Sequence, residues 1–349
     1  MKFRECILHI GTEKTGTTSL RSFLAINREK LLANGIFVPR SLSPYAKLAN
    51  HERITTFALD IRKVRDDLRI AANVTTEDAV NQHRIAVIEG LEREILSIPT
   101  TDHLLLLSNE HCHSRLVELD EVLRLKEFLS RYARKQTVVV YLRPQHELAA
   151  SLYDQALRAG YYDVPLPPVF GPDVREWVNR KYFDYGDLIK RWTHVFSKEN
   201  IIVRIYSEKD LIGGDTAIDL MSQTGCDVSG FERPPRENTS LGIDYQPVLN
   251  VINRISAEKS LRIDAKIRRS IADHLQKLSK LPSRKLSRPE AQRFMEMFKE
   301  SNEEIRRSFF PDRGALFELD FDTLPDEPSA PTADEELLTK AIIDLVKTL

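Results

Sequence analysis

The stretch at residues 5–20, ECILHIGTEKTGTTSL, carries the strongest indication of the fold. An apolar run over 6–10 stops at Gly11, and a loop of small residues then leads into helical periodicity. A strand that passes through such a loop into a helix can hold an anion. Glycines let the backbone come close, and the first N–H groups of the helix point toward the ligand. The stretch therefore predicts an anion-binding loop near the start of an α/β fold.

The position of Lys14 distinguishes this loop from the common triphosphate-binding loop. That loop reads G-x-x-x-x-G-K-[ST], with the lysine after the second glycine. Here Lys14 precedes Gly16, and hydroxyl residues follow at 17–19. The lysine can still bring a mobile positive charge to an anion, but the glycine frame differs from that of a triphosphate site.

The composition is that of an ordinary globular protein. The 349 residues are 42% hydrophobic and 30% charged, enough to bury a substantial core. The 51 lysines and arginines nearly balance the 52 aspartates and glutamates, so overall charge gives no sign of a nucleic-acid partner. Three scattered cysteines suggest a reducing compartment, and no apolar run reaches membrane-spanning length. We therefore expect a cytoplasmic protein with no transmembrane segment and no nucleic-acid partner.

Four apolar runs predict buried parallel strands, at 6–10, 104–107, 137–142 and 201–206. Helical patterns lie after or between them, first over Leu20, Phe23, Leu24 and Leu31 up to Gly35, then at 77–97, 118–133, 145–158 and 184–196. This alternation predicts an α/β fold with a parallel sheet flanked by helices. Because ligands bind beyond the carboxyl ends of such strands, segments 11–19, 108–113 and 143–151 are expected to share one crevice.

The C-terminal third is expected to be mainly helical. Helices are predicted at 244–256, 264–278 and 288–307, forming a helical cap over about 240–310, with a weak strand indication at 316–321. We expect one domain over 1–321, a proline- and acid-rich linker over 322–334, and a final helix over 335–349. That last helix could also support a homo-oligomer.

A second motif lies at the predicted strand ending near 142. Arg143 would stand at the strand tip, and Ser151 follows two turns into the next helix. Together, KTGTTSL at 14–20 and YLRPQHELAASLYDQ at 141–155 closely resemble the two phosphate-binding segments of sulfotransferases that use 3′-phosphoadenosine 5′-phosphosulfate (PAPS). The resemblance spans roughly 5–240 and is closer to the bacterial carbohydrate-sulfating branch. Weaker similarity to that branch is found in NGIFVPRS (34–41), SNEHCHSRL (108–116), RENTSL (236–241) and SNEEI (301–305).

The resemblance implies a P-loop-type fold and a set of site residues. Lys14 would contact the 5′-phosphate and the bridging oxygen, while Arg143 and Ser151 would hold the 3′-phosphate. Arg236 and Ser240 would lie on a loop closing over the nucleotide. Backbone and hydroxyl donors would come from Thr15, Gly16, Thr17, Thr18 and Ser19. The implied reaction moves the sulfuryl group of PAPS to a carbohydrate hydroxyl or amine, with adenosine 3′,5′-bisphosphate (PAP) as product and no metal.

The acceptor must lose a proton, which requires a base within hydrogen-bond reach. We favour Glu110, because it directly follows a predicted buried strand; capping a turn or pairing with an arginine is the alternative role. His51 is the competitor, because histidine titrates near neutral pH and its loop, beyond the first predicted helix, could overhang the site. His111 and His113 fit local packing better than a metal site. The basic stretch over 40–69 could contact an anionic acceptor or simply be solvated.

Two other functions remain open. A P-loop kinase or nucleotide hydrolase would need a magnesium site in the proper glycine frame. A non-catalytic carbohydrate-binding protein on a nucleotide fold would keep Arg143 and Ser151 without needing Lys14 or Glu110.

Overall fold

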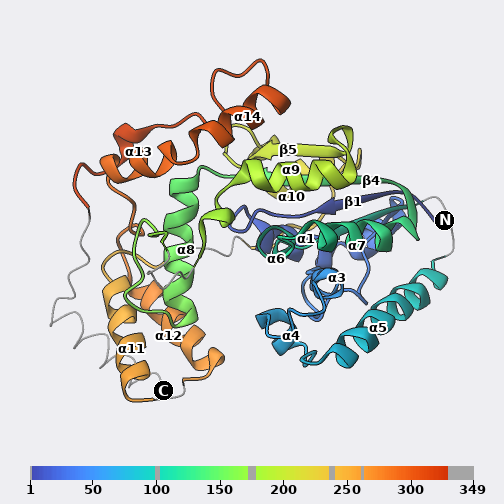
Figure 1. Cartoon of the computed structure of the whole chain (residues 1–349), viewed down its shortest axis with the longest axis horizontal. Helices are drawn as coiled ribbons and strands as arrows, with labels where there is room; N and C mark the ends of the chain where they lie inside the picture. Colours follow the sequence, from blue (N-terminus) through green and yellow to red (C-terminus); the bar gives the residue numbers. More distant parts are fainter. Residues whose placement is uncertain (1, 99–102, 172–177, 236–239, 261–262, 329–349) are drawn as a thin grey trace. The chain divides into compact units, whose positions relative to one another are not determined.

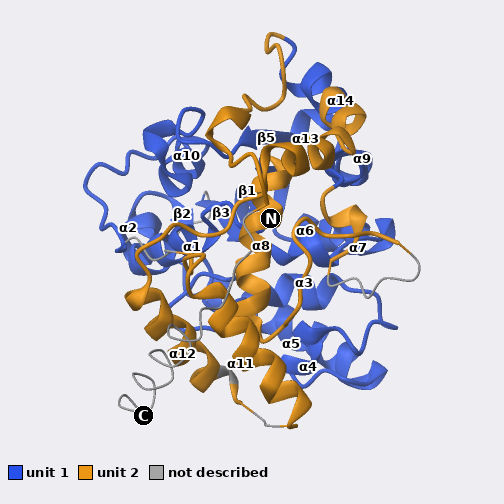
Figure 2. Cartoon of the chain, turned by 90° about the vertical axis from the view of Figure 1, so that its left-hand side faces the viewer, with its two compact units in different colours: residues 1–143, 184–237, 304–311 blue, residues 144–183, 238–303, 312–349 orange. Residues whose placement is uncertain are grey.

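The computed structural model describes residues 2–98, 103–171, 178–235, 240–260 and 263–328 (Figure 1). The chain forms two compact units, coloured separately in Figure 2. Unit 1 comprises 1–143, 184–237 and 304–311, and unit 2 comprises 144–183, 238–303 and 312–349. The final helix predicted at 335–349 lies outside the described residues, as does part of the predicted linker. The single domain expected over 1–321 stays a prediction.

Unit 1 contains a five-stranded sheet in the order β2-β3-β1-β4-β5, and every pair of neighbours is parallel. The strands are β1 (Phe3–His9), β2 (Ile36–Phe37), β3 (His103–Ser108), β4 (Ala133–Leu142) and β5 (Ile201–Ile205). The predicted α/β fold with a parallel sheet flanked by helices is thus confirmed. All four predicted strands form, β4 begins at Ala133 rather than 137, and the two-residue β2 was not predicted.

The helices of unit 1 include every helix predicted there and several short ones that were not. They are α1 (Thr17–Ile26), α2 (Arg28–Ala33), α3 (Glu52–Ala58), α4 (Asp67–Ala71), α5 (Glu77–Leu96), α6 (His111–Arg115), α7 (Leu119–Ser130), α9 (Tyr185–Phe196) and α10 (Thr216–Ser222). Short 3₁₀ turns lie at Lys198–Asn200 and Ile212–Gly214.

The first predicted helix is divided into α1 and α2 at Asn27. The Asn27 side-chain amide donates to Phe23 O (2.9 Å), so it competes with the backbone for that carbonyl. Leu20, Phe23, Leu24 and Leu31 are nonetheless all fully buried, as their common face predicts.

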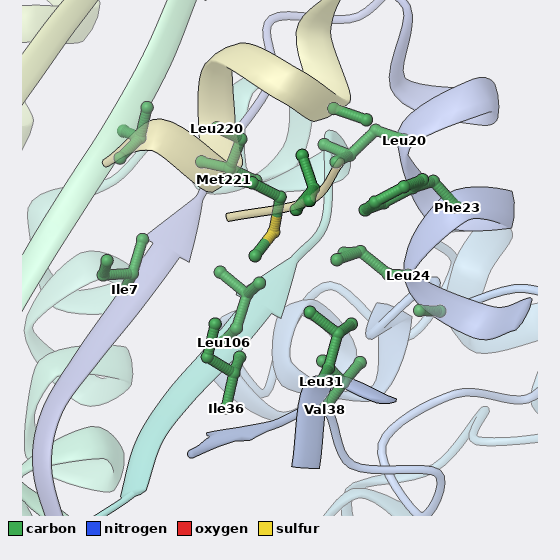
Figure 3. Close-up of a cluster of buried hydrophobic side chains, with 14 of the residues drawn as sticks. Ile7, Leu20, Phe23, Leu24, Leu31, Ile36, Val38, Leu106, Leu220 and Met221 are labelled. Carbon is green, nitrogen blue, oxygen red and sulfur yellow. The ribbon is translucent and has the colours of Figure 1, made fainter. Parts of the chain in front are cut away.

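Those four side chains belong to the hydrophobic core that joins α1, α2 and α10 to the sheet. Figure 3 shows Leu20, Phe23 and Leu24 facing Leu220 and Met221, with Ile7 and Leu106 on the strands nearby. Each such burial stabilises the fold by roughly 1.5–3 kcal/mol. This packing fixes where α1 starts, and therefore where the loop before it ends.

The described part of unit 2 is helical. It contains α8 (Gln145–Ala159), the 3₁₀ turn Arg180–Tyr182, α11 (Gln246–Glu258), α12 (Ala265–Leu278), α13 (Arg288–Glu296) and the 3₁₀ turn Phe321–Thr323. The helix predicted at 288–307 is two helices, since α14 (Lys299–Phe309) follows a break after α13 and extends into unit 1. Residues 240–310 are thus mainly helical as expected, while their role as a cap stays a prediction.

The strand indicated at 316–321 is wrong. That segment has no strand pairing and ends in a 3₁₀ turn. Leu316 and Phe317 are both buried although they are adjacent, so the segment lacks the in-out alternation of a half-buried strand. Among the described residues, no helix has both the length and the apolar character needed to cross a membrane.

Candidate active site

The loop after β1 is held by the end of β4. Ile10 N–H donates to Val139 O (3.0 Å), Thr12 N–H donates to Tyr141 O (2.9 Å), and Tyr141 N–H donates to Gly11 O (2.7 Å). The loop therefore continues the β1–β4 pairing beyond the sheet before it turns into α1. Its first half is fixed by backbone bonds that do not depend on its side chains.

Gly16 forms the turn into α1 and has two reasons to be glycine. Its φ of 76° lies in the left-handed region. A Cβ there would also come within 2.7 Å of Thr216 Oγ1 on α10. That hydroxyl donates to Thr15 O (3.0 Å), so α10 supports the second half of the loop.

The N-terminus of α1 offers backbone donors where the sequence predicted an anion site. Leu20 N–H is the first to bond within the helix, to Gly16 O (3.1 Å). The N–H groups at 17–19 precede it, and within the described ranges they have no hydrogen-bond acceptor. With the helix dipole, these groups favour a negatively charged ligand.

Two of the predicted hydroxyl donors are already used inside the site. Thr15 Oγ1 donates to Thr12 O (2.6 Å), and Thr17 Oγ1 donates to the carboxylate of Glu110. Thr18 and Ser19 are half-buried. The structure therefore assigns Thr15 and Thr17 side chains to holding the loop, which leaves their backbone groups for the ligand.

Lys14 and Arg143 come together at the loop, as the sequence predicted for their segments. Arg143 Nη1 donates to Lys14 O (3.2 Å), and its guanidinium lies over the Tyr206 ring at 5.6 Å from the centroid. Tyr185 Oη donates to Arg143 O (2.7 Å). The Arg143 guanidinium thus lies at the loop that leads into α1, beside the backbone of Lys14, and adds positive charge to this loop.

Glu110 lies against the same loop. Asn109 N–H donates to His9 O (2.9 Å), and a Cβ on Gly11 would lie 3.2 Å from Glu110 Cα. The Glu110 carboxylate pairs with Arg21 Nη2 on α1 (3.0 Å) and accepts the Thr17 hydroxyl, and its side chain is 14% exposed. Glu110 therefore lies beside the loop, as a base would, and it also makes the alternative pairing with an arginine.

His51 has a different environment from the one predicted for a base. Its ring is completely buried, Nδ1 accepts from Ser108 N–H (2.9 Å), and Nε2 lies 3.1 Å from Pro39 O. Burial, followed by the positive charge of Arg28, lowers its pKa to about 3. We therefore correct its predicted role: His51 joins the loop before α3 to the end of β3 and does not overhang the site.

His111, next to Glu110, contacts two carboxylates that the sequence pattern did not predict as its partners. His111 Nδ1 lies 3.6 Å from Glu13 Oε1, and Nε2 lies 4.0 Å from Glu52 Oε2. Burial lowers the pKa of His111, but Glu13, Glu110 and Glu52 outweigh it and raise the pKa overall. Burial would raise the pKa of Glu13, but the His111 contact lowers it to about 2. No local pattern in the sequence marks this pair, because Glu13 and His111 belong to distant segments of the chain.

A buried polar cluster centred on Asp219 of α10 supports the residues that hold the loop. Asp219 is fully buried; it accepts from Tyr141 Oη (2.8 Å), Arg204 Nε (3.0 Å) and Ile212 N–H (3.0 Å). Tyr141 also carries the backbone bonds to the loop, and Thr216 lies one turn before Asp219. The cluster therefore fixes both supports of the loop.

The remaining predicted residues lie elsewhere. Ser151, on α8, and Ser240 belong to unit 2, and Arg236 lies outside the described residues. Leu241 N–H donates to Asp154 Oδ1 (3.0 Å) on α8, so the segment containing Ser240 runs beside the helix that carries Ser151. Their part in binding the 3′-phosphate stays a prediction.

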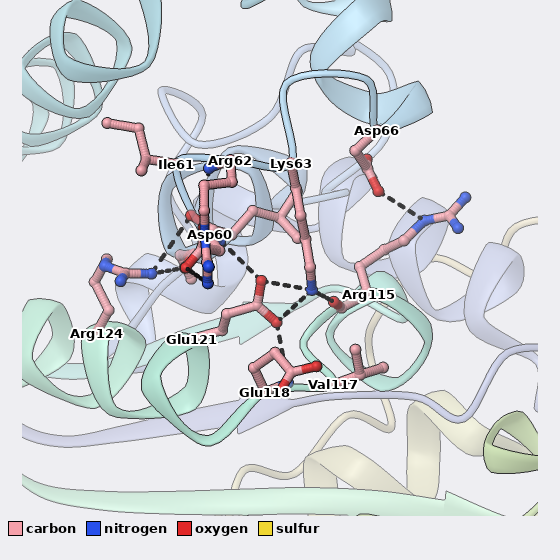
Figure 4. Close-up of polar contacts among 12 residues, drawn as sticks. Asp60, Ile61, Arg62, Lys63, Asp66, Arg115, Val117, Glu118, Glu121 and Arg124 are labelled. Carbon is pink, nitrogen blue, oxygen red and sulfur yellow. Dashed lines mark hydrogen bonds and ion pairs between the residues drawn. The ribbon is translucent and has the colours of Figure 1, made fainter. Parts of the chain in front are cut away.

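Several cations of the basic stretch over 40–69 are held by contacts within unit 1, some of which Figure 4 shows. Arg62 pairs with Asp60 (2.8 Å), and Lys63 pairs with Glu121 (2.7 Å). Arg69 is buried and donates to the carbonyls of Asp60 and Leu59. These contacts favour a structural role for Arg62, Lys63 and Arg69 over contact with an anionic acceptor.

Comparison with known proteins gives no functional assignment. No family model matches the chain. A protein of Archaeoglobus fulgidus, described as uncharacterized, is 28% identical over 203 residues, which cover 56% of this chain. The match covers 51% of that protein, so the similarity spans about half the length of the relative.

Proposed function

We propose that this protein is a sulfotransferase that moves the sulfuryl group of PAPS to a carbohydrate acceptor. The observation that carries the proposal is the loop at 11–19, where the first N–H groups of α1, at 17–19, follow Lys14 closely and Arg143 donates to Lys14 O. This arrangement supports binding of an anionic phosphosulfate. The sequence resemblance supplies the choice of donor.

In the proposed reaction, the acceptor oxygen forms a bond to sulfur while the bond from sulfur to the bridging phosphate oxygen breaks. Negative charge accumulates on that leaving oxygen, as in the loose in-line transfer of phosphoryl groups. Lys14 and the α1 N–H groups would stabilise this charge, and PAP would leave. Glu110 would accept the proton of the acceptor hydroxyl, which requires its carboxylate to exchange Thr17 or Arg21 for the substrate.

Two further parts of the proposal come from the sequence. The 3′-phosphate would be held by Arg143 and Ser151, with Arg236 and Ser240 closing over it. The unpaired cysteines Cys6, Cys112 and Cys226 support a reducing, cytoplasmic setting.

The test is transfer of labelled sulfate from PAPS to a panel of glycans, together with calorimetric binding of PAP in the presence of EDTA. K14A is expected to lower transfer by about a hundredfold or more, the size typical of losing one preorganised charge-stabilising group. The matched control is K30A, because Lys30 is an exposed lysine on α2 whose ammonium group donates to Gly230 O. Equal activity of K14A and K30A would remove Lys14 from the reaction.

The Glu110 environment also favours a second candidate, a non-catalytic protein that binds the nucleotide and a carbohydrate. A carboxylate held by Arg21 and Thr17 can be purely structural. Tight PAP binding without transfer to any glycan would favour this candidate. Binding of ATP that depends on magnesium, with no PAP binding, would instead favour a kinase or nucleotide hydrolase.

A further inference from the structure

Positive charge is concentrated in one segment of unit 2. Residues 254–288 contain eleven lysines and arginines but only three acidic residues, whereas the whole chain has a formal net charge of −1. The segment covers the end of α11, all of α12 and the connection to α13. The near-neutral total therefore hides a strongly basic region.

Six of these cations form what we call the basic face. Each is exposed, and within the described part of the chain none of their charged groups has an ion pair or a hydrogen bond. The six are Lys259, Lys266, Arg269, Lys277, Lys280 and Lys285. The basic stretch over 40–69 is different, because many of its cations bond to carboxylates and carbonyls. The charge of the basic face is therefore available to a partner.

Helix α12 arranges part of this charge in a line. Lys266, Arg269 and Lys277 share the side of the helix opposite the buried Ile271 and Leu275. At 1.5 Å per residue, the line is about 16 Å long. The acid on the same side, Asp273, lies 3.6 Å from Arg158 of α8 and is partly neutralised by it. The line fits an extended ligand carrying repeated negative charges.

The chemistry of the face favours an acidic polysaccharide over nucleic acid or a membrane. The segment that carries the face, 254–288, contains no Phe, Tyr or Trp on which bases could stack. Five of the six cations are lysines, which act as hydrated point charges and lack the bidentate fork used to recognise bases. Ile267, an exposed apolar residue on α12, lies about 100° around the helix from Lys266, so the charged line itself is polar and unsuited to insertion into lipid.

We propose that the basic face docks an acidic polysaccharide, a sugar chain bearing carboxylate or sulfate groups. As an identification of the acceptor class, this rests on the proposed sulfotransferase function. The proposal that the basic face binds such a polysaccharide does not depend on that function. No donor nucleotide is needed for the docking, and no residue of the loop at 11–19 takes part in it.

The test measures binding of a sulfated heparin-type oligosaccharide to the full chain by fluorescence anisotropy. K266Q/R269Q/K277Q is expected to weaken binding at least tenfold at about 50 mM NaCl, and the salt dependence should become shallower as ion contacts are lost. The matched control is R65Q/R131Q/R134Q, which removes three exposed cations of unit 1 that have no ion pair among the described residues, and it should leave affinity within about twofold. Because the three residues replaced in each variant are exposed, both variants should keep the thermal midpoint of the parent protein.

Several outcomes would overturn the proposal. One is equal weakening by the two triple variants. The others are binding of a neutral dextran as tight as that of the sulfated chain, or tighter binding to a DNA duplex of matched charge or to phosphatidylserine vesicles. PAP binding, measured separately, should be unchanged in K266Q/R269Q/K277Q. If no sulfate transfer is found but oligosaccharide binding follows the basic face, the docking site stands and the proposed reaction fails.

Discussion

Replacement of Gly16 by alanine probes the support of the anion loop most directly. Alanine at a φ of 76° costs about 1–2 kcal/mol, of which roughly 0.4–1 kcal/mol is regained because the unfolded chain becomes less flexible. The new Cβ would also lie 2.7 Å from Thr216 Oγ1, which must move and weaken its bond to Thr15 O. Overpacking of this kind costs about 1–3 kcal/mol. We expect G16A to lower the free energy of unfolding by about 2–4 kcal/mol.

Gly35 provides a matched control. It has the same φ of 76°, but a Cβ there would meet no atom within 4 Å. G35A should therefore show only the backbone cost, a net of about 1 kcal/mol. Urea unfolding of the two variants isolates the energetic cost of the contact with Thr216. In the double variant G16A/T216A, removal of the Thr216 hydroxyl should reduce that cost. Equal destabilisation by G16A and G35A, or no coupling to T216A, would refute the assignment of α10 as a support of the loop.

Three other predictions concern the carboxylates of the site. E110Q should reduce sulfate transfer by at least about a hundredfold while PAP affinity, measured by calorimetry, stays within a few-fold, and unchanged turnover would remove Glu110 as the base. D219N should lower the free energy of unfolding by about 2–3 kcal/mol in chemical denaturation, less than for a fully buried pair because Arg204 is 27% exposed. The Glu13–His111 pair should stabilise the fold most between about pH 4.5 and 6.5. The raised pKa of His111 makes its contribution fade as pH rises through the folded value, and the depressed pKa of Glu13 makes its contribution fade as pH falls toward about 2. H111Q should therefore flatten the decline of the urea midpoint above pH 6.5, and an unchanged pH profile would contradict the pairing.

Long buried elements of the fold were predictable, and short or locally contested ones were not. β3 and the second half of β4 are buried on both faces, so their residues form continuous apolar runs. β2 has only two residues in its strand, too few for any periodic signal. The break at Asn27 depends on a side chain competing with the backbone, which apolar periodicity does not report.

In the candidate site too, features with a local sequence pattern were predictable, and features made by long-range contacts were not. Gly11 and Gly16 at a strand-to-helix transition predicted the loop, because that transition leaves a local mark in the sequence. The pairs Arg21–Glu110 and Glu13–His111 join residues far apart in the chain, and charged residues at such positions look like ordinary surface charges until the sheet brings them together. The same long-range contacts decided against His51 as a base, since its ring is enclosed by the segments around Pro39 and Ser108.

The double engagement of Tyr141 makes events at the loop observable from the interior. Its backbone holds Gly11 and Thr12, while its phenol is bound to Asp219 in a place where the ring is fully buried. A fluorinated tyrosine at this position would give a ¹⁹F resonance shielded from solvent. Because Tyr141 is hydrogen-bonded to Gly11 and Thr12, a movement of the loop on anion binding should change that resonance. Ligands could then be screened by a spectroscopic change at one atom, without knowing the reaction and without a label on the surface where the ligand binds.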